Sequence, residues 1–205
     1  MLDQCVRERW GHGFRHNEHS LRVVDQIERL NLTDQVRDGI LNHTGTQVPA
    51  TLEGRIVKVV DRIAYINHDI DDAIRGGVLR FESLPQAEIE LLGDTGSDRI
   101  ETLVVDLLDH SDEAGDILQG EDVGGAMLRL REFMFQQVYL GPSAQLQKPR
   151  IERMLRILFE HYVELPPQPL TPDATDEQRV VDWLAGMTDR FAIRTFTDLS
   201  LPQGF

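Results

Sequence analysis

Apolar residues recur every three or four positions along almost the whole chain, a spacing typical of amphipathic α-helices. No segment shows the sustained apolar–polar alternation and hairpin turns of β-strands. The spacing predicts helices over residues 21–30, 36–41, 51–76, 100–108, 127–138, 151–159 and 180–187. We therefore expect an all-α fold, with residues 165–172 as a rigid proline-rich connector and residues 111–125 as its most mobile loop.

Helix ends carry recognisable signals. Thr33 is expected to cap the helix that follows it, and the long helix is expected to start at Thr51. Asn17 is a further candidate N-cap. His43 lies near the end of its helix, where a cation is favourable, so a structural capping role is expected for it.

Length and composition limit the class of protein. The 205 residues are enough for one sizeable core or two small domains, and we expect one compact unit. No apolar run is long enough to cross a bilayer, and the first residues lack the apolar region of a signal peptide. A single cysteine, Cys5, fits a reducing compartment. These features predict a cytoplasmic protein without membrane contacts.

The net charge limits the partners. With 35 acidic and 21 basic residues, the formal net charge is −14. Nucleic acids and anionic membranes require basic surfaces, so general nucleic-acid binding is not expected. A small phosphate-bearing ligand remains compatible with this charge, because a pocket needs only a few local arginine or lysine residues.

The most informative segment is the expected long helix. Its apolar stripe is formed by Ile56, Val60, Ile63, Ile70 and Ile74. Asp61, Tyr65 and Asp69 fall on the opposite face at i, i+4 and i+8, joined by Asp72. Such a face is usually the solvent side of an amphipathic helix. Carboxylates one turn apart also suit a hard cation or sugar hydroxyls, and a tyrosine among them favours partial burial.

A histidine-rich segment precedes this helix. His12, His16 and His19 fall within eight residues. Gly13 disfavours a helix through His12 and His16, and no glutamate follows His12 directly, so a zinc site on these histidines alone is weakly supported. The segment is either the N-terminus of a helix or the position of a single histidine that acts as a catalytic acid or base. The ordinary pKa of histidine lies near working pH, which suits such a role.

Two strings are the most specific in the chain: VDRIAYINHDIDD at 60–72 and GMTDRFA at 186–192. Further informative segments lie at 14–24, 31–33, 39–45 and 130–133. Taken together and in this order, these segments resemble the bacterial dGTPase-like deoxynucleoside triphosphate (dNTP) triphosphohydrolases of the HD superfamily. The resemblance implies an HD-type helical bundle, incomplete at its N-terminus. Residues 1–80 would be the remainder of the HD core, and residues 81–205 a helical C-terminal region.

The resemblance also implies an activity and a set of residues. The family's enzymes cleave a dNTP between the α-phosphate and the deoxyribose oxygen, with a divalent metal, Mg²⁺ or Mn²⁺, held by a His…His-Asp…Asp set. Asp61 matches the last metal ligand, and His16 matches a histidine near the scissile bond. The residues that match substrate contacts are Arg62 for phosphate, Tyr65 and Asp69 for the sugar 3′-hydroxyl, and Arg131 and Tyr139 for the phosphates and nucleoside.

The sequence departs from the family in its metal ligands. No histidine followed by a His-Asp pair precedes His16, and the His68–Asp69 dipeptide belongs to the long-helix motif instead. A cation held by one carboxylate binds weakly. We expect a homo-oligomer and little triphosphohydrolase activity from this chain alone. The alternative is a catalytically inactive interaction or regulatory module derived from the same family.

Overall fold

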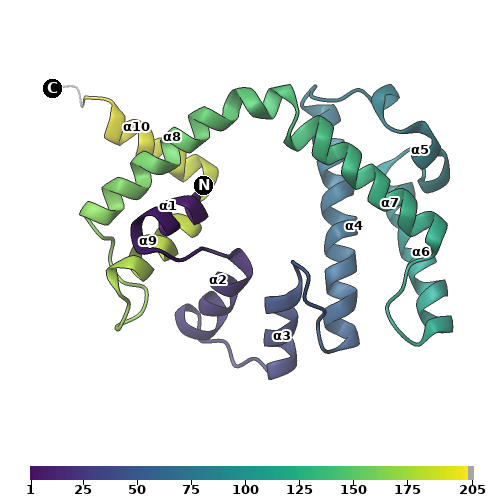
Figure 1. Cartoon of the computed structure of the whole chain (residues 1–205), viewed down its shortest axis with the longest axis horizontal. Helices are drawn as coiled ribbons and strands as arrows, with labels where there is room; N and C mark the ends of the chain where they lie inside the picture. The colour runs from purple at the N-terminus through teal and green to yellow at the C-terminus, as the bar shows by residue number, and fades with distance from the viewer. Residues whose placement is uncertain (203–205) are drawn as a thin grey trace. The chain divides into compact units, whose positions relative to one another are not determined.

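The computed structural model describes residues 1–202, and these residues form helices and loops without a β-strand (Figure 1). This confirms the expected all-α class. The helices of the N-terminal half are α1 (Leu2–Trp10), α2 (His16–Arg22), α3 (Asp34–Asn42), α4 (Leu52–Arg75) and α5 (Gln86–Leu92). Those of the C-terminal half are α6 (Gly96–Ala114), α7 (Glu121–Met134), α8 (Pro142–Glu164), α9 (Asp176–Ala185) and α10 (Asp189–Ser200). Short turns complete the described elements: η1 (Val23–Ile27), η2 (Phe81–Ser83) and η3 (Phe135–Tyr139).

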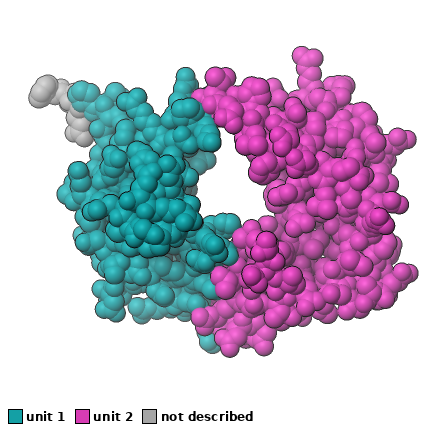
Figure 2. All heavy atoms as spheres, viewed as in Figure 1, with its two compact units in different colours: residues 1–31, 147–205 teal, residues 32–146 magenta. Residues whose placement is uncertain are grey.

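The chain forms two compact units, where we had expected one (Figure 2). The first unit contains residues 1–31 and 147–205, and the second contains residues 32–146. Residues 32–80 and 81–146 belong to the same second unit, because α4 packs with α5, α6 and α7 in one core. The first unit joins both ends of the chain, because α1 packs with α8 and α9.

The second unit is built on the apolar face of α4. Ile63, Ile66, Ile70 and Ala73 are each at most 6% exposed, and burying each large aliphatic side chain contributes about 2 kcal/mol. The partners from α5, α6 and α7, together with the preceding loop, are Leu84, Ile89, Leu92, Leu103, Ala126, Met127, Leu130 and Met134. This core fixes which face of α4 remains available to other groups.

The prediction of the apolar stripe on α4 is confirmed only for the second half of the helix. Ile63 and Ile70 are buried, but Ile56 is 36% exposed. The buried stripe continues through Ile66 and Ala73 instead. The reason is the position of the partners: the buried residues of α5, α6 and α7 pack with the later turns of α4, while the first turns lie against α3.

The first unit has a smaller core with many aromatic residues. Cys5 and Val6 of α1 pack against Phe159 of α8 and Val180 of α9. Trp10 meets Phe159 edge-on, with ring centroids 5.3 Å apart, an arrangement that aromatic quadrupoles favour. In the described part of the chain, no helix combines the length and the apolar character needed to cross a membrane.

The capping signals were mostly interpreted correctly. Thr33 and Thr51 accept hydrogen bonds from the backbone N–H groups of Val36 and Gly54, at 3.4 and 3.1 Å. His43 occupies the C-cap of α3, where its Nδ1 lies 2.7 Å from the Ile40 carbonyl. The Asn17 cap was wrong, because α2 already begins at His16 with the extended Arg15 as its N-cap.

The segment expected to be a long mobile loop is mostly helical. α6 continues to Ala114, where Gly115 adopts φ 65° and ends the helix in the left-handed conformation. α7 then begins at Glu121, whose charge is favourable in the first turn of a helix. Only residues 115–120 connect the two helices.

A buried arginine connects α4 and α6. Arg99 is 1% exposed. Its Nε donates to the Asn67 side-chain oxygen at 2.7 Å, its Nη1 to the Asp94 carbonyl at 2.9 Å and its Nη2 to Asp71 at 3.1 Å. Asn67 is itself 1% exposed, so its side-chain oxygen would lack a donor if Arg99 were removed.

We expect Arg99→Met to lower the free energy of unfolding by about 3 kcal/mol, because buried acceptors without donors are costly. Arg129→Met is the matched control, since Arg129 is 62% exposed and its Glu88 ion pair contributes at most about 1 kcal/mol. Urea unfolding followed by circular dichroism measures both variants. Equal destabilisation by the two substitutions would contradict the assigned role of Arg99.

Candidate substrate site

Two candidate residues on α4 are turned toward α7. The buried stripe of α4 holds Tyr65 and Asp69 half-buried at the edge of the core, one helical turn apart. Arg131 of α7 and Tyr139 of η3 lie opposite them. The structure thus brings together four residues that the sequence nominated separately.

Two hydrogen bonds join these residues into what we call the polar cluster: Tyr65, Asp69, Arg131 and Tyr139. The Arg131 Nε donates to the Tyr65 hydroxyl at 2.7 Å. The Tyr139 hydroxyl donates to the Asp69 carboxylate. Each bond joins α4 to the α7–η3 segment.

Phe135 is an unpredicted neighbour of the polar cluster. The Arg131 guanidinium lies over its ring, 5.8 Å from the centroid, within range of a cation–π attraction. The Phe135 and Tyr139 rings meet edge-on at 5.6 Å. The four-residue spacing of Arg131, Phe135 and Tyr139 was the sequence signal that could have indicated this row.

The environment of Tyr139 disfavours its ionised form. Burial, the hydrogen bond to Asp69 and the Asp69 charge raise the pKa of the Tyr139 hydroxyl well above its ordinary value, and Tyr65 adds to the effect. The Arg131 charge partly opposes it. Tyr139 therefore stays a neutral hydrogen-bond donor at physiological pH.

Asp61 and Arg62 precede the polar cluster on α4. The Asp61 side chain is exposed. Arg62 lines a cavity of about 380 Å³ together with Gly120 and Glu121 at the N-terminus of α7. Among residues 1–202, no group of three or more His, Cys, Asp or Glu side chains is arranged to hold a metal ion. The described residues therefore do not fit a complete divalent-metal site around Asp61.

His16 belongs to the first unit, where it is the first residue of α2. It lines a cavity of about 530 Å³ with His19 and Asp182. The side chain of Asp182 is 1% exposed and accepts hydrogen bonds from Arg22 Nε and Nη2 at 2.8 and 2.7 Å. His19 Nε2 lies 3.1 Å from the same carboxylate. Asp182 thus attaches α2 to α9, a role without a local sequence signal.

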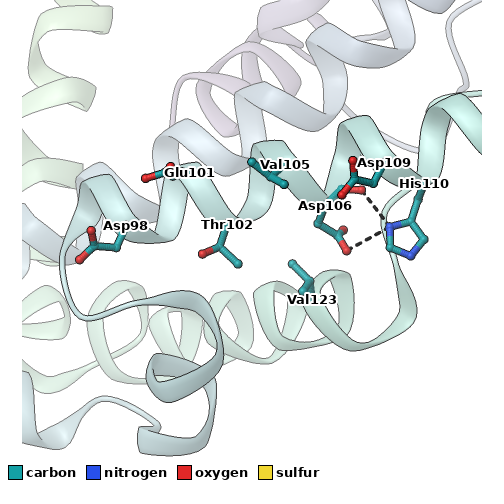
Figure 3. Close-up of a pocket in the computed structure, with 8 residues that line it drawn as sticks. All are labelled: Asp98, Glu101, Thr102, Val105, Asp106, Asp109, His110 and Val123. Carbon is teal, nitrogen blue, oxygen red and sulfur yellow. Dashed lines mark hydrogen bonds and ion pairs between the residues drawn. The ribbon is translucent and has the colours of Figure 1, made fainter.

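A further groove follows α6 in the second unit and contains none of the nominated residues (Figure 3). Asp98, Glu101, Asp106 and Asp109 line it from α6. His110 bonds to the Asp106 carbonyl and lies 3.2 Å from the Asp106 carboxylate. The backbone hydrogen bond and the neighbouring carboxylates raise the pKa of His110. Asp106 also accepts from the Gly120 N–H at 2.9 Å, so its carboxylate serves the connection between α6 and α7.

Comparisons of the sequence with known proteins found similar proteins of one named kind. Residues 118–198 match the family described as "Phosphohydrolase-associated domain". Over 93% of its length, the chain is 42% identical to the "Deoxyguanosinetriphosphate triphosphohydrolase-like protein" of Caldanaerobacter subterraneus subsp. tengcongensis. Identity to the protein of the same name is 39% in Clostridium perfringens strain SM101, over 93% of the chain, and 35% in Desulfatibacillum aliphaticivorans, over 98%.

The chain is a homologue of the dGTPase-like proteins. This confirms the family resemblance found in the sequence. The chain spans 59%, 61% and 65% of the lengths of these three dGTPase-like relatives.

We expect Asp69→Asn to lower the pKa of Tyr139. The amide keeps a hydrogen-bond acceptor but removes the negative charge that opposes ionisation of the phenol. Asp109→Asn on α6 is a matched charge control and should leave the Tyr139 titration unchanged. Tyrosine-specific NMR during a pH titration measures both, and a Tyr139 pKa unaffected by Asp69→Asn would contradict the assigned contact.

Proposed function

We propose that this chain supplies the substrate-facing part of a dNTP triphosphohydrolase, which converts a dNTP to a deoxynucleoside and tripolyphosphate. The observation that carries the proposal is the polar cluster. Two pairs of side chains, nominated for the sugar and the phosphates, meet between α4 and the α7–η3 segment. The names and the similarity of the dGTPase-like relatives support the reaction class.

The polar cluster contains groups suited to a nucleotide. The Asp69 carboxylate accepts one hydrogen bond from Tyr139 and has further lone pairs for a sugar 3′-hydroxyl. The Arg131 guanidinium carries several N–H donors, of which the contact to Tyr65 uses one. The others suit phosphate oxygens, which a planar guanidinium binds in a bidentate manner. Arg62 would add a second positive charge on the phosphate side.

His16 is proposed for proton transfer. Cleavage between the α-phosphate and the deoxyribose oxygen leaves an alkoxide-like oxygen that needs a proton, and an imidazole supplies one near neutral pH. A divalent metal, Mg²⁺ or Mn²⁺, would stabilise the phosphate charge when bound, with Asp61 as one ligand. The residues that the structure describes do not complete such a site. We also propose that the protein forms a homo-oligomer in the cytoplasm.

We expect the chain alone to release tripolyphosphate from dGTP only slowly in the presence of Mn²⁺, because a single carboxylate holds a divalent cation weakly. Ion chromatography of the products measures the release, with a complete dGTPase-like relative assayed in parallel. If the chain released tripolyphosphate as fast as the relative, the expectation of low activity would be wrong.

Nucleotide binding separates the proposal from the inactive-module alternative. We expect Asp69→Asn to weaken dGTP binding about tenfold, because the amide still accepts the sugar hydroxyl but without the charge that strengthens the hydrogen bond. The same substitution should leave the affinity for 2′,3′-dideoxy-GTP unchanged, since that probe has no 3′-hydroxyl. Isothermal titration calorimetry measures both affinities, with Asp109→Asn as the control. Absence of dGTP binding by the unmodified chain would favour an interaction or regulatory module.

A further inference from the structure

In the polar cluster, two side chains of α4 face two side chains of the α7–η3 segment. The spacing along one segment must match the spacing along the other for both contacts to form. Tyr65 and Asp69 are four residues apart on one α-helix, whereas Arg131 and Tyr139 are eight residues apart on the opposite segment. In an uninterrupted α-helix, eight residues overshoot two turns by about 80°. Tyr139 would then point away from the direction of Arg131.

The opposite segment is not an uninterrupted α-helix. α7 ends at Met134, and Phe135–Tyr139 forms a π-helical turn. Its wider hydrogen bonding is shown by the Leu140 N–H, which donates to the Phe135 carbonyl five residues earlier, at 2.9 Å. A π-turn places more residues in each turn than an α-helix, and such turns occur frequently at functional sites. Here the extra residue offsets the overshoot, and the Tyr139 hydroxyl reaches Asp69.

Gly141 closes this turn. Its N–H donates to the Val138 carbonyl at 3.3 Å, and the residue is buried. A Cβ atom on Gly141 would overlap the Gln137 carbonyl oxygen and lie 2.7 Å from the carbonyl carbon. Because the obstacle is backbone, no side-chain rotation relieves it. Any residue other than glycine at this position forces the turn to change.

We propose that the π-helical turn, closed by Gly141, is the element that sets Tyr139 in register with Asp69, and that Gly141 is a positioning residue for the proposed sugar contact. The importance of this register for nucleotide binding rests on the proposed function. The geometry itself does not, because it concerns only contacts within residues 65–141.

The substitution Gly141→Ala tests the register directly. The chain has three tyrosines, Tyr65, Tyr139 and Tyr162, so ring-labelled tyrosine gives three NMR signals. We expect Gly141→Ala to shift the Tyr139 signal and to lower the pKa of Tyr139, as Asp69→Asn does, because the contact with Asp69 is lost. Tyr162 belongs to the first unit and reports any general disturbance.

Gly39→Ala is the matched control. A Cβ on Gly39 lies 3.7 Å from the Gly54 Cα, an ordinary contact, so all three tyrosine signals should stay in place. If Gly141→Ala leaves the Tyr139 signal and pKa as they are in the unmodified chain, the proposed positioning role is wrong.

A second variant decides the question if Gly141→Ala does not fold. Deleting Gln137 removes the extra residue, so that an ordinary α-helix places Tyr139 seven residues after Arg131, about 20° short of two turns. We expect a folded helical protein whose Tyr139 signal and pKa keep the features of the Asp69 contact without the π-turn. Loss of those features in a folded deletion variant would overturn the proposal.

A double-substitution cycle links the register to binding. Gly141→Ala should weaken dGTP binding about tenfold in the unmodified chain and add almost nothing in a Tyr139→Phe background, because both changes remove the same contact. Equal losses in both backgrounds would overturn the positioning role. If the tyrosine signals respond as expected while the unmodified chain binds no dGTP, the proposed function fails and the register assignment stands.

Discussion

The apolar face of α4 is the constraint on which the second unit depends. Burial of Ile63, Ile66 and Ile70 against α5, α6 and α7 fixes the rotation of α4 about its own axis. That rotation holds Tyr65 and Asp69 at the edge of the core beside α7. It also places Asn67 inside, where only a buried donor such as Arg99 satisfies it. The site and the core are therefore two consequences of one helix orientation.

The polar cluster is where we propose that this acidic protein would bind a phosphate-bearing ligand. The chain is strongly acidic, yet Arg131 is held in place by the Tyr65 hydroxyl and the Phe135 ring. A side chain that is already ordered in the free protein loses less conformational entropy when a ligand binds, so the entropic cost of binding is lower. Tyr139 is kept neutral by burial and by Asp69, so it donates a hydrogen bond and would not repel the proposed phosphate.

Local signals predicted helices well where they were strong. Thr33, Thr51 and His43 mark helix ends in both sequence and structure. The short helices α1 and α5 and the separate α10 were not predicted. Helices of seven to nine residues, such as α1 and α5, gain most of their stability from packing and not from intrinsic propensity. Cys5 and Val6 illustrate this, since α1 is held by contacts with α8 and α9.

The sequence by itself determined the all-α class, the relation to the dGTPase-like proteins and the common face of Asp61, Tyr65 and Asp69, because helical periodicity and ordered motifs are local properties. Only the tertiary structure decided that Arg131 contacts Tyr65 and that Tyr139 contacts Asp69. The partners are 66 positions apart in the first contact and 70 positions apart in the second. It likewise revealed the role of Asp182, 160 positions from Arg22, and the π-turn closed by Gly141. Such contacts depend on how helices pack and where a helix widens, which no local spacing encodes.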